Sequence, residues 1–487
     1  MSITSALSSA LSGLSVTSRQ AELVSSNVAN AMTPGYARRE LGVTAAIFAG
    51  TGQGVAITGV SRHLDRALLA DRRLAQAGDG DRGVRGGFFK TFETVLGTPD
   101  SAGALASRLA EFDRSLTEAA GRPDSEAKLQ SVLSAAKHLA SGLVSASDDI
   151  QQARATADRQ IGAEVTKLNA TLSRLQDLNT ELRSFSGAGR DVSALLDERQ
   201  RLIDTISTIV PVREVSRDLN QIALFTTGGA TLLEGSATVF GFTPANAMTP
   251  ETTQALGGLS GITLNGKPFA TAGSASPILG GTLGGLFAVR DDLAVVAQGK
   301  LDAVARDLVE RFSAAGLDPT LAPGSAGLFT DAGGAFSPLD EIGLAGRLQV
   351  NAAADPQRGG ALYRLRDGLG ASAEGLAGNG NLLRQMQMRL SDVQPLASSG
   401  FTAGARSFST LMSDLHSDAS ALRLSGEADQ SLSAARLTAL TDLEAQNGID
   451  TDQEMQALLV IEKNYAANAK VVQTVENMID ILIRIGT

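Results

Sequence analysis

The chain has 487 residues, with 42 Lys and Arg against 52 Asp and Glu, so its formal net charge is −10. This acidic balance argues against nucleic-acid binding, which needs concentrated positive charge. There is no cysteine, which excludes disulfide bonds and thiolate metal sites. A hydrophobic content of 43% is ample for a core, and the length suggests two to four domains.

The first thirty residues predict an amphipathic helix. Two mainly apolar rows recur every seven positions, as in the seam by which one helix packs along another. The rows are Ile3, Ala10, Thr17 and Val24, and Leu7, Leu14, Ala21 and Val28. No basic segment or compact apolar segment precedes or forms part of this pattern, so no cleaved secretory signal is expected. The longest apolar runs are also too short to span a membrane.

A turn signal follows this helix. Asn30 can adopt the left-handed conformation that ends a helix. Residues 33–36 predict a type II turn, because Pro occupies the second position and Gly the third, where φ must be positive. The whole run reads N-x-x-N-x-x-T-P-G-Y-x-R and comprises Asn27, Asn30, Thr33, Pro34, Gly35, Tyr36 and Arg38.

The next part of the chain is mainly helical. Residues 54–60 predict a short strand, and residues 61–116 keep helical spacing. A long helix is expected from Asp124, a candidate N-cap. Its apolar residues keep helical spacing until Gly187 and Gly189 end it. A second, antiparallel helix is then expected up to Pro211.

The character changes after Pro211. Seven of the 13 prolines lie in residues 244–338, where turns and short strands are expected. A helix over about 280–315 interrupts this region, and helices resume from about residue 360. Helices therefore precede and follow the β-rich middle of the sequence. This order places both termini together in one domain and the middle of the sequence at the far tip.

The last stretch predicts a long helix. Thr451 and Glu454 form a T-x-x-E capping box, and neither Pro nor Gly follows until Gly486. Asn468 is the polar member of an otherwise apolar seam, and such a residue tends to fix register. The seam consists of Leu458, Tyr465, Val472 and Ile479, and of Ile461, Asn468, Val475 and Leu482.

No residue pattern suggests catalysis. The three histidines, at 63, 138 and 416, are scattered and indicate neither a catalytic triad nor a zinc site. The acidic pairs at 79–81 and 450–452 lack the continued spacing of a calcium loop. We therefore expect no catalytic residue, no cofactor and no metal, and a protein that is not an enzyme.

Both ends of the chain resemble one family. The run ending at Arg38, together with N-G-I-D at 447–450 and Y-A-A-N-A-K-V-V at 465–472, resembles the ends of bacterial flagellar axial proteins, the rod, hook and hook-associated proteins. The L-L-D-x-R run at 195–199 and the long helical hairpin over 124–210 resemble the hook-associated members.

The resemblance implies a mainly α fold with a β-rich insertion. It would be a nested multidomain axial protein, with paired terminal helices as a coiled coil, a long helical bundle and a small β domain at the tip. The expected units are a terminal tube domain (1–60 with 440–487), a helical bundle (61–211 with 283–315 and 360–439) and a β-rich outer domain (212–282 with 316–359).

The resemblance also implies a function. The expected protein is a structural subunit that joins hook to filament, is exported by the flagellar type III apparatus without a cleaved signal, and is extracellular. Its implied partners are copies of itself in a ring-like homo-oligomer, the hook protein, a second junction hook-associated protein and an export chaperone, with neither nucleic acid nor membrane.

The terminal helices are the expected assembly interface. Its residues would be Ile3, Leu7, Leu14, Val24, Val28, Leu458, Ile461, Tyr465, Asn468, Val472, Val475, Ile479 and Leu482. Two alternatives stay open. One is another flagellar axial protein, from the hook or the distal rod. The other is a secreted effector with an amphipathic membrane-binding terminus, although the terminal helices lack the basic face that would favour it.

Overall fold

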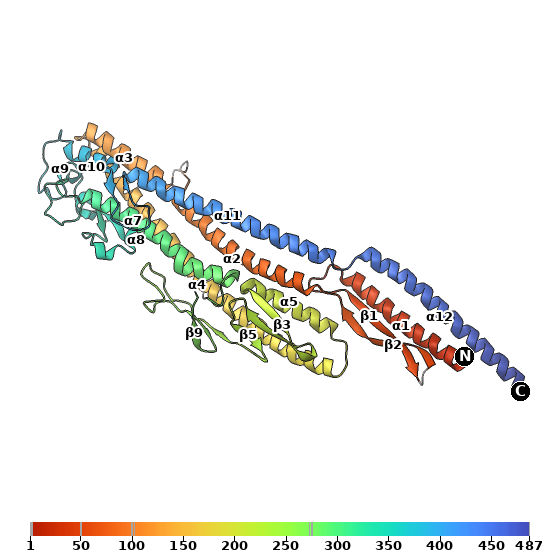
Figure 1. Cartoon of the computed structure of the whole chain (residues 1–487). Coiled ribbons are helices and arrows are strands. Elements are labelled where there is room, and N and C mark those ends of the chain that lie inside the picture. The colour runs from red at the N-terminus through yellow and green to blue at the C-terminus, as the bar shows by residue number, and fades with distance from the viewer. Residues whose placement is uncertain are drawn as a thin grey trace.

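The computed structural model describes residues 3–48, 51–98, 101, 103–271, 273 and 276–486. They form an elongated molecule with both chain ends at one end of a helical shaft (Figure 1). Residues 1–2 and 487, the outermost positions of the two predicted terminal segments, lie outside the described residues.

Long helices make up most of the molecule. The helices are α1 (Ile3–Asn30), α2 (Arg66–Leu96), α3 (Leu105–Gly121), α4 (Glu126–Gly187), α5 (Ser193–Ile209), α6 (Gly281–Ala288), α7 (Ala294–Phe312), α8 (Leu344–Arg347), α9 (Arg364–Asp367), α10 (Asn381–Ser391), α11 (Phe408–Gln446) and α12 (Thr451–Gly486). A turn of π-helix, Val289–Leu293, joins α6 to α7. The mainly α fold is thereby confirmed.

The strands form small antiparallel sheets. They are β1 (Arg39–Phe48), β2 (Thr51–Arg62), β3 (Val212–Ser216), β4 (Ile222–Thr226), β5 (Thr231–Glu234), β6 (Ser236–Ala237), β7 (Phe240–Gly241), β8 (Ile262–Leu264), β9 (Lys267–Phe269), β10 (Phe329–Asp331), β11 (Leu348–Val350), β12 (Gln394–Pro395) and β13 (Ala405–Arg406). The sheets follow the orders β1-β2, β3-β4-β5-β6, β7-β8-β9, β10-β11 and β12-β13.

The 62-residue helix α4 is the centre of the shaft. At 1.5 Å per residue it is about 90 Å long. Its second half buries a row of leucines at helical spacing, which pack towards α5 and the strands. This row is Leu168, Leu172, Leu175, Leu178 and Leu182. The predicted helical hairpin of α4 and α5 is confirmed, since Gly187 ends α4 and α5 packs back against it.

Helices α2 and α11 run side by side along the shaft (Figure 1). They approach closely where Gly86 faces Gly426. A Cβ atom on Gly426 would lie 3.4 Å from the Cα of Gly86 and 2.8 Å from Cδ2 of Phe89. The absence of side chains at both positions therefore allows the two backbones to meet, with Phe88 and Phe92 buried nearby in the core.

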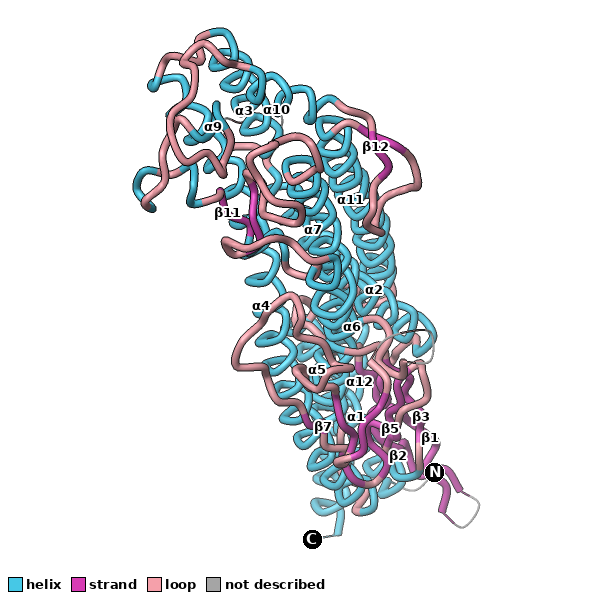
Figure 2. The backbone as a smooth tube through the Cα atoms, turned by 90° about the vertical axis from the view of Figure 1, so that its left-hand side faces the viewer, coloured by secondary structure: helices cyan, strands magenta, loops and turns pink. Residues whose placement is uncertain are grey.

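The end of the molecule that holds the termini combines helices with a β-hairpin. Helix α1 packs against α12 and against β1 and β2, and Figure 2 shows these strands beside α1. Sequence reasoning predicted a strand only at 54–60. The first strand escaped it because Gly42 and two alanines weaken the alternating pattern of β1, whose register with β2 shifts beside Gly42.

The position of the β-rich segment differs from the expectation. Strands β3 to β9 lie on the flank of the shaft, beside α4 and α5, while α3, α9 and α10 form the end far from the termini (Figure 1). The reason is the length of α4, whose leucine row offers an apolar surface on which Ile222, Leu224 and Leu233 are buried. Asn179 of α4 also donates to the carbonyl of Ile222 at 2.9 Å.

Strands β10 and β11 pack separately, against α7 and α4. The division of the chain into a terminal domain, a helical bundle and an outer β-rich domain stays a prediction. None of the helices in the described ranges is both long and apolar enough to cross a lipid bilayer.

Candidate functional site at the junction of the chain ends

The seam between α1 and α12 contains most of the expected interface residues, but it covers them incompletely. Ile461, Val475 and Val24 are buried. Half-buried positions are Ile3, Leu7, Leu14, Val28, Leu458, Asn468, Val472 and Ile479. Tyr465 and Leu482 keep 48% and 56% of their surface exposed, so within one chain they are not seam residues. Among the described elements α12 packs extensively only against α1, which covers one narrow stripe of it.

The polar member of the seam has a defined partner position. A Cβ atom on Gly13 would lie 2.7 Å from Nδ2 of Asn468, so the Asn468 side chain fills the space that Gly13 leaves. Ser12, on the neighbouring face of α1, accepts a hydrogen bond from the backbone N–H of Val55 at 3.2 Å. Helix α1 therefore presents one face to α12 and an adjacent face to the hairpin, where Val16 and Leu23 are buried.

The predicted capping box is wrong in its partners. The N-terminal N–H groups of α12 are capped by Asp450, whose Oδ1 accepts from the N–H of Asp452 at 2.9 Å and of Gln453 at 3.2 Å. Glu454 is instead 1% exposed. Its carboxylate accepts from Nε of Arg38 at 2.6 Å and from Nδ2 of Asn27 at 3.1 Å. A buried carboxylate needs such partners, and the N-terminal run supplies them.

Asn27 is the centre of this contact and uses all its hydrogen-bonding positions. Its Oδ1 accepts from the N–H of Arg39 at 3.0 Å and from the hydroxyl of Tyr36 at 3.1 Å. Its Nδ2 donates to the carbonyl of Arg39 at 3.0 Å as well as to Glu454. An amide with two donors and an acceptor oxygen is suited to this role. The hydrogen bond that Arg38 itself donates to Glu454 raises the pKa of the Arg38 guanidinium.

The turn has the predicted geometry at Gly35. Its φ is +79°, and the N–H of Tyr36 donates to the carbonyl of Thr33 at 3.1 Å, as a type II turn requires. Pro34 and Thr33 are exposed. The prediction for Asn30 is wrong, because it is not among the residues with positive φ. Its side chain instead donates to the carbonyl of Ser26 at 2.9 Å, and α1 ends at Asn30 without a left-handed residue there.

Asp197 of α5 joins this region to the helical shaft. It accepts from Nη2 of Arg39 and from Nη2 of Arg62, each at 2.6 Å, and from the N–H of Ala37 at 3.4 Å. Burial lowers the pKa of Arg62, and Asp197 opposes that shift. Sequence reasoning did not assign Asp197 a role. The sequence feature that could have pointed to Asp197 is its place in the L-L-D-x-R run.

The contacts of Glu454 and Asp197 form a first layer of ion pairs, and a second layer lies beside it. Asp204 of α5 pairs with Arg72 at 2.6 Å and with Arg73 at 2.7 Å. Arg72 also pairs at 2.6 Å with Glu444 near the end of α11, where burial raises the pKa of the Glu444 carboxyl and Arg72 opposes it. Together the two layers, which we call the polar junction, connect α1, the hairpin, α2, α5, α11 and α12.

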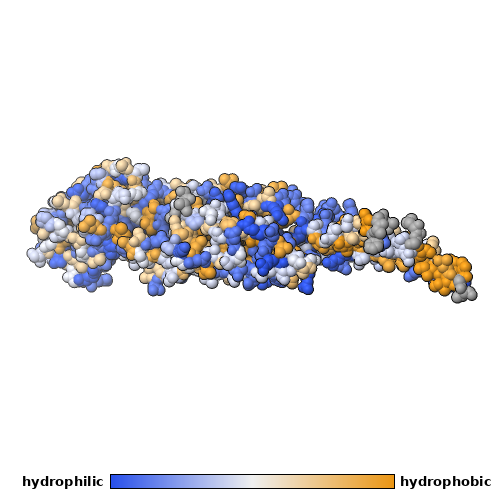
Figure 3. All heavy atoms as spheres, turned by 60° about the horizontal axis from the view of Figure 1, so that its bottom comes forward, coloured by the Kyte–Doolittle hydropathy of each residue, from blue (hydrophilic) through white to orange (hydrophobic). Residues whose placement is uncertain are grey.

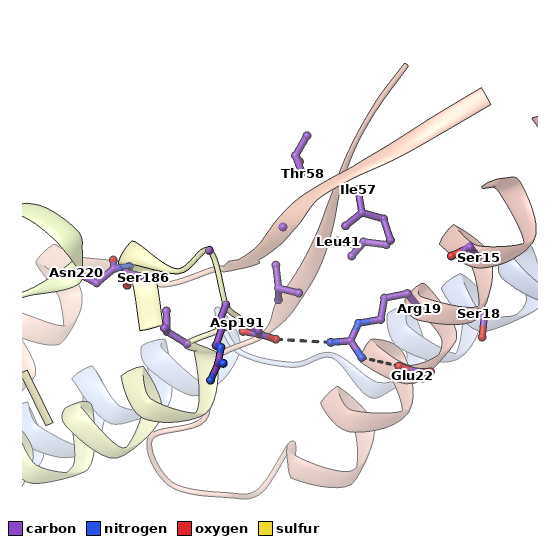
Figure 4. A pocket seen from close by; sticks show the side chains of 15 residues that line it. Ser15, Ser18, Arg19, Glu22, Leu41, Ile57, Thr58, Ser186, Asp191 and Asn220 are labelled. Atoms are coloured by element: carbon purple, nitrogen blue, oxygen red, sulfur yellow. Dashed lines mark hydrogen bonds and ion pairs between the residues drawn. The ribbon is translucent and has the colours of Figure 1, made fainter. Parts of the chain in front are cut away.

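An open cleft of about 720 Å³ lies next to the polar junction, between α1, β2 and the loop that follows α4 (Figure 4). Arg19 reaches across it, paired with Glu22 at 2.6 Å and with Asp191 at 3.7 Å. The charge of Arg19 is therefore already balanced by carboxylates of the chain itself. Within the part of the chain that the structure describes, His, Asp and Glu side chains do not gather in a group of three or more that could hold a metal ion.

The exposed apolar side chains of α12 are the second notable feature. The apolar side chains of α12 that α1 leaves largely exposed are called the outer stripe here, and they are Met455, Leu459, Val460, Val471, Met478, Ile481, Ile483 and Ile485. Their exposed fractions lie between 43% and 77%, and Figure 3 shows hydrophobic residues gathered at this end of the molecule. Sequence reasoning identified only the inner seam, although these residues are visible between its heptad positions.

Family comparisons match three parts of the chain. Residues 89–326 match the model described as the flagellar hook-associated protein FlgK helical domain. Residues 445–485 match the flagellar basal body rod FlgEFG protein C-terminal model, and residues 7–36 match the flagella basal body rod protein model. The last two matches contain most of the terminal seam.

Individual proteins similar to this chain also carry the name of a flagellar hook-associated protein. Flagellar hook-associated protein 1 of Escherichia coli (strain K12) is 25% identical over 245 residues, 48% of this chain and 44% of that protein. The protein of the same name from Bacillus subtilis (strain 168) is 26% identical over 219 residues, 42% of this chain and 43% of that protein. The matched region thus spans less than half the length of these relatives.

A solved structure titled as the flagellar hook junction protein FlgK from Burkholderia pseudomallei is 22% identical, with a TM-score of 0.43. The alignment covers 54% of this chain and 46% of that one.

Proposed function

This chain belongs to the family of flagellar hook-associated protein 1, and we propose that it is a structural subunit that joins the hook of the bacterial flagellum to its filament. The match of residues 89–326 to the hook-associated helical domain supports this role over that of a hook or rod subunit. In the proposal the protein acts outside the cell, after export by the flagellar type III apparatus.

The observation that carries the proposal is the outer stripe of α12. Burying a Leu, Ile or Val side chain stabilises by about 1.5–3 kcal/mol, and these side chains are roughly half exposed. Several of them buried together would therefore supply enough free energy for a specific interface, even after the entropy of association. Large exposed apolar surfaces of this kind mark interaction sites.

The occupant that we propose for the outer stripe is the terminal helix pair of a second copy. Two residues of the stripe, Val471 and Met478, also line an apolar groove of about 520 Å³ together with Ile3, Ala6 and Val475. The groove of one copy could receive the remaining stripe residues of the next, such as Leu459 and Ile481, so that the copies pack in a head-to-tail manner. Contacts of this type close into rings or continue as helices, which suits a ring-like homo-oligomer.

The remaining partners follow from the proposed position. The hook protein would contact one side of the ring, and the second junction hook-associated protein the other. An export chaperone would cover the outer stripe before assembly. The mechanism is geometric: the terminal helices form an inner tube, and the helical bundle and the β-rich segment form outer domains that match the hook to the filament.

The experiment is a substitution in the outer stripe with a matched control. Leu459→Asp places a charge in the proposed interface, and Leu432→Asp places the same charge on α11, where Leu432 is 74% exposed. Since Leu459 is 56% exposed, both purified variants should unfold at the same urea concentration as the parent. Cells that carry Leu459→Asp should build hooks but release filament subunits into the medium.

Cells with the control variant should swim normally. Normal filaments on cells that carry Leu459→Asp would contradict assembly through the outer stripe. A loss of filaments in both variants would also contradict it, because the effect would then not be specific to α12.

A further inference from the structure

A second cavity lies beside the polar junction, on the side of the helical shaft. Its volume is about 350 Å³, and it is lined by residues from β2, α2, α5 and β3. Four arginines line it, one from β2, two from α2 and one from α5. They are Arg62, Arg66, Arg73 and Arg199. Glu214 is the carboxylate among the lining residues.

The carboxylates near this cavity are largely engaged. Asp197 forms ion pairs with Arg62 and with Arg39, each at 2.6 Å. Glu214 accepts from Nη1 of Arg73 at 2.9 Å. Both acids are therefore already hydrogen-bonded to a cation other than Arg66 or Arg199.

The other two arginines have weaker partners. Arg199 lies 3.7 Å from Glu214, which is too long for a hydrogen bond, and its Nη1 donates to the carbonyl of Asn220. Arg66 donates to the hydroxyl of Ser216 at 3.1 Å. A guanidinium carries five N–H donors, so both of these cavity-lining side chains have donors beyond those that the bonds above use.

The electrostatics of Arg199 agree with an excess of positive charge. Burial lowers the pKa of its guanidinium to about 10. Glu214 opposes that shift, while Arg62, Arg66 and Arg73 each add to it. A multivalent anion among these groups would remove the repulsion that the four arginines exert on one another.

We propose that this cavity is a binding site for a small tetrahedral oxyanion, such as phosphate or sulfate. Planar guanidinium forks bind such oxygens through paired hydrogen bonds. A water molecule takes about 30 Å³ of liquid, so the cavity holds a five-atom anion with several waters. The anion would be held by Arg66 and Arg199 and would face Arg62 and Arg73.

The position of the site gives the anion a structural effect. Arg62 lies at the end of the hairpin that packs on α1, whereas Arg66 and Arg199 belong to helices of the shaft. A bound oxyanion would therefore cross-link the part of the molecule that holds the termini to the helical shaft, in parallel with Asp197.

The test is calorimetric titration of the purified full chain with inorganic phosphate, at constant ionic strength set with sodium chloride. Saturable binding to one site is expected, and sulfate should compete with it. Acetate, which presents a single planar carboxylate, should not compete at the same concentration. Competition by acetate as strong as that by sulfate would overturn the assignment to a tetrahedral oxyanion.

Two variants locate the site. Arg66→Gln removes a rim arginine that makes one hydrogen bond, and it should weaken phosphate binding at least tenfold. Arg213→Gln removes an exposed arginine of β3 that does not line the cavity, and it should change binding less than twofold. Circular dichroism should show both variants folded.

A third variant tests the geometry of the contact. Arg199→Lys keeps the charge but loses the planar fork, so it should also weaken binding several-fold. Equal phosphate affinity in the parent, Arg66→Gln and Arg213→Gln, or no saturable binding to the parent, would overturn the proposal.

Discussion

Asn27 and Glu454, which are 427 positions apart in the sequence, share a buried hydrogen bond of 3.1 Å. Arg38 adds a second bond to the same carboxylate at 2.6 Å. The N-terminal run is thus more than a turn. It shapes the exit from α1 and, at the same time, holds the first turn of α12 against it.

The first prediction concerns this carboxylate. Glu454→Ala leaves Arg38 without its main partner and removes one of the two acceptors of Asn27 Nδ2, and breaking a buried pair costs about 3–5 kcal/mol. Because the Arg38 side chain is 20% exposed, we expect a loss near the lower end of that range. The measurement is the free energy of unfolding in urea. Glu462→Ala, on the exposed side of α12, is the control. Equal unfolding of the two variants would contradict the role of Glu454.

The second prediction concerns the turn. Gly35→Val should destabilise the protein by about 2 kcal/mol or more, because a β-branched residue resists positive φ. A Cβ atom there would also lie 2.7 Å from Cγ of Arg201. Met32→Val is the matched control, since Met32 is 95% exposed. Ala37 would be a poor control, because it is only 5% exposed. The readout is the urea midpoint, and similar midpoints for both variants would refute the requirement for glycine.

The third prediction concerns Asp197. Asp197→Asn should cost about 3 kcal/mol, because Arg39 and Arg62 lose the carboxylate that they share in a mostly buried site. Glu198→Gln changes the next residue, whose surface pair with Arg201 contributes about 0–1 kcal/mol. Thermal unfolding followed by circular dichroism measures both. If the neighbouring substitution proves as harmful as that of Asp197, the link to α5 has been overestimated.

The fourth prediction concerns pH. Asp302 of α7 is 2% exposed and accepts from the N–H groups of Gly343 and Ala345 at 2.8 and 2.9 Å. Burial raises the pKa of its carboxyl from 3.8 to about 6. Between those values the folded chain holds the proton that the unfolded chain has lost. The contribution of Asp302 to stability therefore falls as pH rises from about 4 to about 6, by about 3 kcal/mol in total.

Asp302→Asn removes this titration and retains an acceptor oxygen of the same size. The unfolding free energy of the variant relative to the parent should therefore rise across the same interval and stay level above it. Urea unfolding of both proteins at pH 4, 5, 6 and 7 measures the difference. Parallel curves over the whole range would show that Asp302 titrates normally in the folded protein.

The long helices could be predicted from the sequence because their apolar residues repeat over many turns. The leucine row of α4 and the seams of α1 and α12 contain this repeat, and Gly187 and Gly486 mark the ends of α4 and α12. The turn at Gly35 was also predictable, since Pro followed by Gly specifies its backbone.

The polar junction could not be predicted in the same way. Glu454 fits a capping box in the sequence, and only the arrival of Asn27 and Arg38 from the other end of the chain gives it different partners. Asp197 likewise depends on Arg39 and Arg62, which reach it from the hairpin. Long-range pairing of this kind leaves no local periodicity, so it is absent from any pattern along one segment.

The pairing of α1 with α12 and of α2 with α11 has a consequence for the time course of folding. Each partner is separated from the other by most of the chain. At a synthesis rate of about 5–20 residues per second, α11 leaves the ribosome roughly 20 to 70 s after α2. During that interval the side of α1 that faces α12 and the side of α2 that faces α11 have no native neighbour. Completion of this end of the molecule is thus the last event in folding, whatever the speed of the individual helices.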